Sequence, residues 1–393
     1  MKKSVIFLCK KIGYCNLLGL LSLIILVPIF ASKVSADSFQ NPNQNLIDSV
    51  MTSSPKKAKK QKIKKKKTVY SHSSPSSLGS YRNYIHKKRP KLRAKAYIAL
   101  DRKSGNVLTQ KNSHHRYLVA STGKLMTIYL ARRKLANHPK AWKKKLKYSS
   151  SLVRMARNPS LDGFHARRGH KYTLRTIMKS AIIDSDNNSA IRLGQWVGGS
   201  NKHFISMMNK QARLWHLKAR FTSASGLEND DLARYGFWVK GGYYSGNLLS
   251  AKDLAVIAYH LVNDYPSIMK YFKTKVAYAS GQRLVNQNRI LPGQKYYIRS
   301  LQPDGLKTGY TPRSGLCFVG TCNKKRGLIT VVINDPNEFS DTDKLMKYTY
   351  KHMHKIKKSK KKVQKQTNSV NNNPSATATD DQNANTSDSD KNN

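Results

Sequence analysis

Residues 117–127, with the sequence YLVASTGKLMT, place a serine three residues before a lysine at the start of an apolar segment. The apolar residues that follow recur with the spacing of a helix. Residues three apart on a helix share one face, so we predict that the side chains of Ser121 and Lys124 are in contact. Taken alone this pattern is a weak signal. In this lysine-rich chain four other serines also precede a lysine by three positions: Ser53, Ser54, Ser267 and Ser359.

Two further motifs follow along the chain and strengthen the first. The segment IIDSDNNSA contains Ser-Asp-Asn at 185–187, in a predicted turn where an apolar helical stripe ends. The segment PDGLKTGYT contains Lys-Thr-Gly at 307–309, at the start of the C-terminal strands. Taken alone, the motif at 185–187 could be a polar helix cap, and the motif at 307–309 an ordinary strand with a bulge glycine. Three such motifs in this order, each in a fitting structural setting, instead predict one shared site.

The pattern between residues 92 and 352 predicts one α/β (α+β) domain with an antiparallel sheet, because strands lie at both ends and helices between them. The segment is long enough to enclose a substantial core. The predicted elements are a hairpin at 94–110, a helix at 172–183 behind a Thr173 cap, strands at 315–322 and 328–334, and a final helix at 342–354.

Cysteine adds little to this interpretation. Cys317 and Cys322 lie five positions apart in one predicted strand, so they are expected on opposite faces of the sheet. We therefore predict two buried thiols and no disulfide between them.

The two ends of the 393-residue chain are predicted to be non-globular. Residues 1–36 resemble a secretory signal, with lysines before an apolar run and an A-x-A-like site ending at Ala36; an uncleaved membrane anchor is the alternative. Residues 37–91 and 353–393 are polar and carry long lysine runs, so we predict a disordered basic linker and a disordered tail. The formal net charge is +53, which bears on partners and not on the fold.

These motifs are characteristic of penicillin-binding proteins and class A β-lactamases. Residues 94–350 resemble, well beyond the motifs, the low-molecular-mass penicillin-binding proteins of the serine D-alanyl-D-alanine carboxypeptidase family. The similar segments include AYIALDRKSGNVLTQ, SASGLEND and DGLKTGYTPRSGLCFVGTC. The resemblance implies a penicillin-binding/β-lactamase-like fold with an inserted helical subdomain, and a catalytic domain at 92–352.

The resemblance also assigns roles to the motif residues. Ser121 would be the nucleophile, Lys124 its base, and Ser185 a proton relay to the leaving amine. The remaining residues would bind substrate: Asn187 its amide, Lys307 and Thr308 its terminal carboxylate, Gly309 its backbone by close approach, and the backbone N–H groups of Ser121 and Tyr310 the oxyanion. The expected ligands are peptidoglycan stem peptides and β-lactams, and no cofactor or metal is expected.

A serine–lysine pair works only if the amine is uncharged when it takes the serine proton. Bringing a lysine from its ordinary pKa of about 10.4 to near 7 takes a shift of roughly 3 units. Burial and a second nearby cation both lower a lysine pKa. We expect burial of Lys124 and proximity of Lys307 to supply these effects.

Three residues depart from the family pattern. Val119 stands where the family has proline and Gly123 where it has threonine, and neither supplies a reacting group. Asp186 occupies a position that is small in most relatives. A carboxylate there would stabilise the charged form of Lys124, so Asp186 is expected to point away from the lysine.

The motifs and the composition are also compatible with other functions. A D,D-endopeptidase or weak transpeptidase would use the same acyl-enzyme. A class A-like β-lactamase needs a deacylating glutamate in a Glu-x-x-Leu-Asn setting, and Glu228, the only glutamate before Lys307, lacks it. A non-enzymatic basic protein would bind anionic wall polymers or a membrane surface through its lysine-rich arms. The expected export to the outer face of a bacterial membrane or to the wall argues against nucleic acid as a partner. The histidines lack metal-binding spacing.

Overall fold

The computed structural model of the protein describes residues 89–352. The predicted signal at 1–36, nearly all of the predicted linker and the predicted tail lie outside these residues. Within the described part, no helix is both long enough and apolar enough to cross a membrane.

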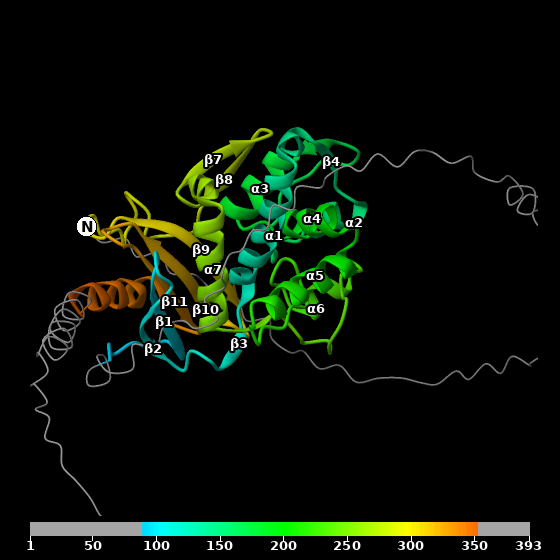
Figure 1. Ribbon diagram of the computed structural model, residues 1–393. Coiled ribbons are helices and arrows are strands. Elements are labelled where there is room, and N and C mark those ends of the chain that lie inside the picture. The colour runs from blue at the N-terminus through cyan, green and yellow to red at the C-terminus, as the bar shows by residue number, and fades with distance from the viewer. Residues whose placement is uncertain (1–88, 353–393) are drawn as a thin grey trace, which may run out of the picture. The chain divides into compact units, whose positions relative to one another are not determined.

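An antiparallel five-stranded sheet forms one side of the domain, in the order β2-β1-β11-β10-β9 (Figure 1). Its first strands form the predicted hairpin, which turns at Gly105 with φ +71°. The C-terminal strands form a meander in which β10 pairs with both neighbours. The strand bounds are β1 Ala96–Asp101, β2 Val107–Lys111, β9 Pro303–Thr311, β10 Gly315–Cys322 and β11 Leu328–Ile333.

In the sequence, the helices α1 to α8 come after β3 and before β9. The Thr173 hydroxyl oxygen accepts a hydrogen bond from Thr176 N and caps α3, as predicted. The helices are α1 Lys124–Asn137, α2 Ser150–Met155, α3 Leu174–Ile183, α4 Asn187–Gly198, α5 Asn201–Leu214, α6 Asn229–Ala233, α7 Ala251–Asp264 and α8 Met269–Phe272. Three two-stranded ladders brace them: β3 Arg116–Leu118 with β6 Leu248–Ser250, β4 Lys145–Lys147 with β5 Lys171–Thr173, and β7 Val276–Ala279 with β8 Gln282–Val285.

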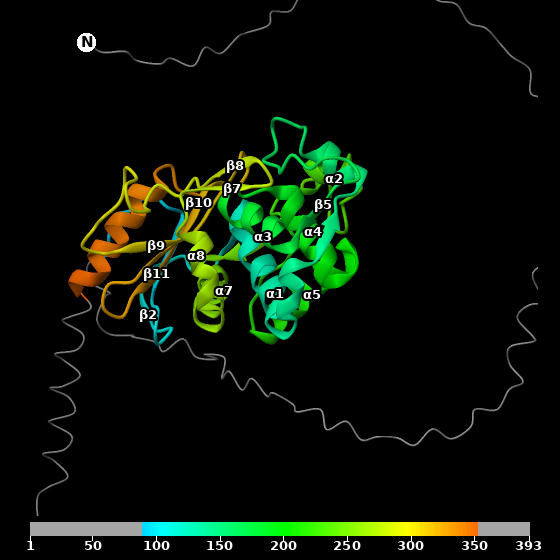
Figure 2. The same ribbon diagram turned by 90° about the horizontal axis from the view of Figure 1, so that it is seen from above.

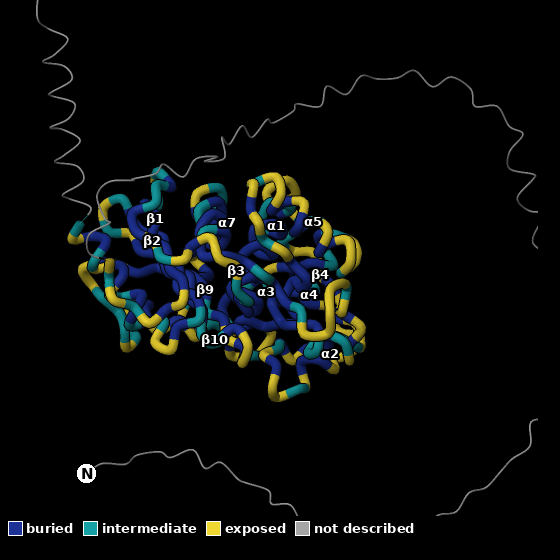
Figure 3. Tube along the Cα trace, turned by 90° about the horizontal axis from the view of Figure 1, so that it is seen from below, coloured by how far each residue is buried: buried dark blue, intermediate teal, exposed yellow. Residues whose placement is uncertain are grey.

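Helices lie on both sides of the sheet (Figure 2), and most of the sheet residues are buried (Figure 3). On one face, alternate residues of β1 such as Ile98 join a core shared with α1, α3, α4, α5 and α7. On the other, Tyr97 packs in a smaller core under a C-terminal helix at 338–352. Because successive strand residues point to opposite faces, β1 and β11 are apolar along nearly their whole length.

The sequence-based expectations for the fold are confirmed in outline. The predicted strands at 315–322 and 328–334 correspond to β10 and β11. The last helix starts at 338, four residues before the predicted start, and residues 353–354 of that prediction lie outside the described chain. Cys317 and Cys322 are free buried thiols in the two different cores, so they do lie on opposite faces.

Candidate active site

Ser121 lies in a single 3-10 turn, Ala120–Gly123, which leads directly into α1. Lys124, the first residue of α1, is 0 % exposed. Its Nζ lies 2.6 Å from Ser121 Oγ, so the predicted contact is present. The turn before the helix holds the hydroxyl over the lysine and thereby brings the two side chains together.

The second motif forms the turn between α3 and α4. Ser185 takes a left-handed conformation with φ +64° and is buried. Asn187 is the first residue of α4, so only Ser185 and Asp186 lie in the predicted turn. The Asn187 Oδ1 accepts a hydrogen bond of 2.8 Å from Lys124 Nζ, which joins the first two motifs directly. Among the described residues, no hydrogen bond links the Ser185 hydroxyl to these groups.

The third motif lies on β9, at the edge of the sheet. The Lys307 side chain is buried, with 3 % of the residue exposed, and its Nζ donates a 3.0 Å hydrogen bond to Thr308 O. The side chains of a strand alternate, so Thr308 and Tyr310 point to the face opposite Lys307 and Gly309. Tyr310 is 62 % exposed.

The pKa values of Lys124 and Lys307 are both lowered, and the shift is the larger one at Lys124. Burial, and then the nearby charge of Lys307, lower the pKa of Lys124 well below its ordinary value. Burial also lowers the pKa of Lys307, to about 8, while Asp162, Asp184 and Asp186 act against this shift. Lys307 therefore keeps most of its charge at neutral pH, and that charge favours the uncharged form of the Lys124 amine.

Gly309 touches the turn that carries Ser121. A Cβ at Gly309 would lie 2.9 Å from both Thr122 N and Val119 O, and 3.0 Å from Ser121 N. Real Cβ atoms show almost no contacts this short. Sequence reasoning assigned Gly309 to close approach of the substrate. In the structure the same missing side chain lets β9 lie against the backbone of the serine turn.

A second glycine, Gly226, approaches this turn from another side. With φ +91°, its missing Cβ would lie 2.0 Å from Ala120 O. Ala120 itself has a left-handed φ of +46°. Gly226 lies in the SASGLEND segment, which resembles the family, but the sequence pattern predicted no role for it.

Asn247 packs directly against Gly123. Its Nδ2 lies 2.7 Å from the position of a Cβ on Gly123, so the amide occupies the space that a side chain at 123 would need. The same side chain accepts hydrogen bonds from Thr222 N and Ser223 N, and its backbone O accepts one from Val119 N. Asn247 thus fastens the loop that contains Gly226 to the serine turn. Sequence analysis did not find it.

Asp186 is nearly buried and lines a cavity together with Asp162 and Asp184. Its Oδ2 has no hydrogen-bond partner among the described residues, and within the same residues no ion pair joins it to Lys124. Burial raises the pKa of Asp186 to about 8. The carboxyl group is therefore mainly protonated at neutral pH, which limits its stabilisation of a charged Lys124.

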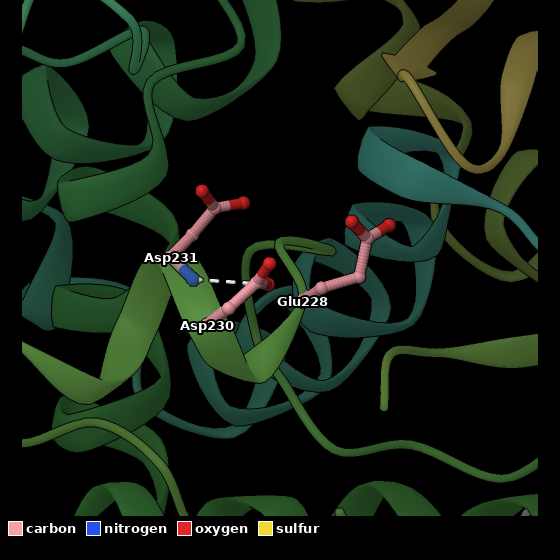
Figure 4. Close-up of side chains that lie close together, drawn as sticks. All are labelled: Glu228, Asp230 and Asp231. Atoms are coloured by element: carbon pink, nitrogen blue, oxygen red, sulfur yellow. Dashed lines mark hydrogen bonds between the residues drawn. The ribbon is translucent and has the colours of Figure 1, made fainter. Parts of the chain in front are cut away.

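Three acidic side chains gather at the start of α6, as Figure 4 shows: Glu228, Asp230 and Asp231. Arg313, in the turn after β9, forms ion pairs with Glu228 at 3.2 Å and Asp230 at 2.6 Å. Glu228 also accepts a 2.7 Å hydrogen bond from the Thr311 hydroxyl. These contacts tie the far end of β9 to α6 and occupy the carboxylate of Glu228.

The contact at Gly309 leads to a stability prediction. Gly309→Ala should lower the free energy of unfolding by roughly 1–3 kcal/mol, the usual cost of overpacking, because the new methyl group meets backbone atoms. Urea unfolding followed by circular dichroism measures this. Gly242→Ala is the control, since its nearest contact is 3.8 Å away. Equal midpoints for both variants would show that β9 and the serine turn are not in contact.

A second prediction concerns Asp186, whose pKa rises from 3.8 in the unfolded chain to about 8 in the fold. The folded state retains a proton that the unfolded state releases, so this group's stabilisation is complete below pH 3.8 and is lost as pH rises toward 8. Asp186→Asn should therefore gain stability relative to the wild type as pH rises from 4 to 8.

Asp230→Asn is the control of opposite sign, because the hydrogen bond to Arg313 lowers the pKa of Asp230. The stabilisation by Asp230 is present above pH 3.8 and disappears in acid, so this variant should be the less stable one near neutrality. Denaturant midpoints at a series of pH values test both. A pH-independent difference between Asp186→Asn and the wild type would contradict the assignment.

Comparison with known proteins agrees with this geometry. Residues 83–337 match the family described as D-alanyl-D-alanine carboxypeptidase. D-alanyl-D-alanine carboxypeptidase DacF of Bacillus subtilis is 30% identical over 239 residues, which cover 59% of this chain and 54% of the relative. DacD of Escherichia coli is 26% identical over 255 residues, covering 62% and 59%. The chain thus spans less than two thirds of the length of these relatives.

Solved structures show the same architecture. PBP3 of Streptococcus pneumoniae, described as a peptidoglycan synthesis regulatory factor, has a TM-score of 0.63 and 29% identity, covering 66% of this chain and 72% of that one. Penicillin-binding protein D2 of Listeria monocytogenes, solved with cefotaxime bound, has a TM-score of 0.56 and 26% identity, covering 67% and 100%. These similarities confirm the predicted penicillin-binding/β-lactamase-like fold. The chain belongs to the D-alanyl-D-alanine carboxypeptidase family.

Proposed function

We propose that the protein is a serine-type D-Ala-D-Ala carboxypeptidase that removes the terminal D-alanine from peptidoglycan stem peptides. One observation carries the proposal: a buried lysine amine lies 2.6 Å from a serine hydroxyl, and burial and a second lysine lower its pKa. A nucleophile beside a neutral base is what acyl transfer requires. Family membership supports the same activity.

In the acylation step, Lys124 takes the proton of Ser121 as the Ser121 oxygen attacks the carbonyl of the penultimate D-alanine. The negative charge on the carbonyl oxygen is stabilised by the backbone N–H groups of Ser121 and Tyr310. The approach of Gly309 to Ser121 N, inferred from the 3.0 Å Cβ distance, supports this assignment. Ser185 relays the proton held by Lys124 to the leaving amine, and the C–N bond breaks to release free D-alanine. Water then attacks the acyl-enzyme and gives a proton to Lys124, which returns it to the Ser121 oxygen as the acyl bond breaks.

Substrate selection depends on the terminal carboxylate. Lys307 supplies the positive charge for it and precedes Tyr310 on the same strand, whereas the Thr308 side chain points to the opposite face. Asn187 holds an amide of the substrate while its own oxygen is fixed by Lys124. A C-terminal acid is therefore preferred to an internal peptide, and the bicyclic carboxylate of a penicillin would occupy the same position.

The related reactions share this acyl-enzyme. Endopeptidase or weak transpeptidase activity would differ only in the leaving or accepting amine. β-Lactamase activity is disfavoured because Glu228 is engaged by Thr311 and Arg313. We further propose that the protein is exported, and that its lysine-rich arms contact anionic wall polymers or the membrane surface. This binding would act beside the enzyme activity and not in place of it.

The decisive experiment uses the full chain and its Ser121→Ala variant. The wild type should release D-alanine from a stem pentapeptide and become covalently labelled by a fluorescent penicillin at Ser121, whereas the variant should do neither. Ser150→Ala, at an exposed position in α2, is the control and should behave as the wild type. Wild-type labelling without D-alanine release would refute the hydrolytic assignment, and absence of any covalent label would refute the acyl-enzyme.

The pKa of Lys307 gives a further prediction. The rate constant for acylation by a penicillin should fall as pH rises through about 8, because Lys307 loses the charge that binds the carboxylate. The methyl ester of the same penicillin lacks that carboxylate and should show no such decline. Stopped-flow acylation at a series of pH values compares the two. An identical alkaline decline for acid and ester would contradict this role of Lys307.

A further inference from the structure

Three large aromatic side chains lie exposed on the loop after α6. The aromatic patch consists of Trp238, Tyr243 and Tyr244, which are 45%, 47% and 64% exposed. The Trp238 and Tyr243 ring centroids are 5.9 Å apart, and those of Tyr243 and Tyr244 are 5.0 Å apart. Contiguous exposed apolar groups on a soluble domain mark binding sites more often than isolated ones do.

The loop that displays the patch is held in place from beneath. Asn229 is fully buried, and its Nδ2 donates hydrogen bonds to Lys240 O at 2.8 Å and Gly242 O at 2.9 Å. Its backbone N donates to Ser245 O. Trp238 Nε1 donates to Gly241 O at 3.0 Å. The aromatic rings are therefore presented by an ordered scaffold, an arrangement typical of recognition loops.

Arg313 locates the patch relative to the reactive serine. Its guanidinium carbon lies 4.4 Å from the centre of the Tyr244 ring, which is cation–π distance. Arg313 stands two residues after the end of β9, in the turn toward β10. The patch thus lies beside the Thr311 end of the strand that carries Lys307 and Gly309, the residues whose side of β9 meets the substrate in the proposed function.

The order of groups along β9 gives the substrate a direction. In the proposed function its terminal carboxylate lies at Lys307, and its reacting carbonyl at the N–H of Tyr310. The remaining residues must therefore continue past Tyr310 toward Arg313 and Tyr244. Three or four extended residues span roughly 10–14 Å, and Arg313 follows Tyr310 by three residues, which reach at most about 10 Å. The amino-terminal end of a stem peptide, where the glycan is attached, points to the patch.

We propose that the aromatic patch is a saccharide subsite, which binds a pyranose ring of the glycan strand that carries the stem peptide. The C–H face of a pyranose is apolar and stacks on an aromatic face, while its hydroxyl and acetamido groups need donors and acceptors at the edge. Tyr243 and Tyr244 hydroxyls and Arg313 offer these. The inference rests on the proposed function, and it makes a glycan-linked stem a better substrate than a free peptide.

The first test compares two substrates that differ only in the sugar, a free stem pentapeptide and the same pentapeptide on its disaccharide. The double variant Trp238→Ala/Tyr244→Ala should lower kcat/KM for the disaccharide-linked substrate by about tenfold, which corresponds to roughly 1.4 kcal/mol of binding. Its kcat/KM for the free peptide should not change. Tyr278→Ala, at a 68% exposed position on β7, is the matched control and should leave both values unchanged.

A second measurement does not depend on turnover. The peptide-free disaccharide is titrated into the Ser121→Ala protein while the indole N–H resonance of Trp238, assigned with Trp238→Phe, is followed by NMR. A saturable shift is expected. No shift, or an equal change of kcat/KM for both substrates, would overturn the subsite. The saccharide subsite would also be overturned if the patch variants changed only self-association or binding to vesicles. If neither substrate released D-alanine, the proposed function would fail, and the titration would still decide whether the patch binds sugar.

Discussion

The lowered pKa of one buried amine is the constraint on which the rest of the site depends. Lys124 is removed from water, has Ser121 and Asn187 as hydrogen-bond partners, and lies within the field of Lys307. Each of these contacts comes from a different part of the chain, so the base exists only in the folded domain. The carboxyl groups around Lys307, Asp162 first among them, act in the opposite direction and limit the fall of its pKa. The different surroundings of the two lysines thus favour different protonation states.

Backbone packing fixes the positions of Ser121, Lys124 and β9 relative to one another. The serine turn is enclosed by Gly226 on one side and Gly309 on the other, and Asn247 occupies the space beside Gly123. The contacts at Gly226 and Gly309 are between main chains. A site built on such contacts fixes the hydroxyl, the base and the edge of β9 to within a fraction of an ångström, which is the precision that acyl transfer demands.

The sequence predicted those parts of the site that are encoded locally. Helical spacing was enough to bring Ser121 to Lys124, and strand alternation placed Cys317 and Cys322 in different cores. Gly226 and Asn247 were not found, because close approach of segments about a hundred residues apart leaves no trace in the pattern of either one. Gly309 was predicted to lie close to the substrate, and its contact with the serine turn was not predicted. Trp238 and the two tyrosines near it carry no local sign of exposure, since aromatic residues usually pack in a core.

Enclosure by main chain also determines how the site can move. A side chain that blocks a cleft can leave it by rotating about one bond, but a peptide backbone cannot. Any widening at Gly309 must therefore separate β9, and the sheet to which it is hydrogen-bonded, from α1 as a unit. We expect β9 and the serine turn to separate only slowly and collectively, so that a ligand meets an arrangement of backbone groups that is already fixed.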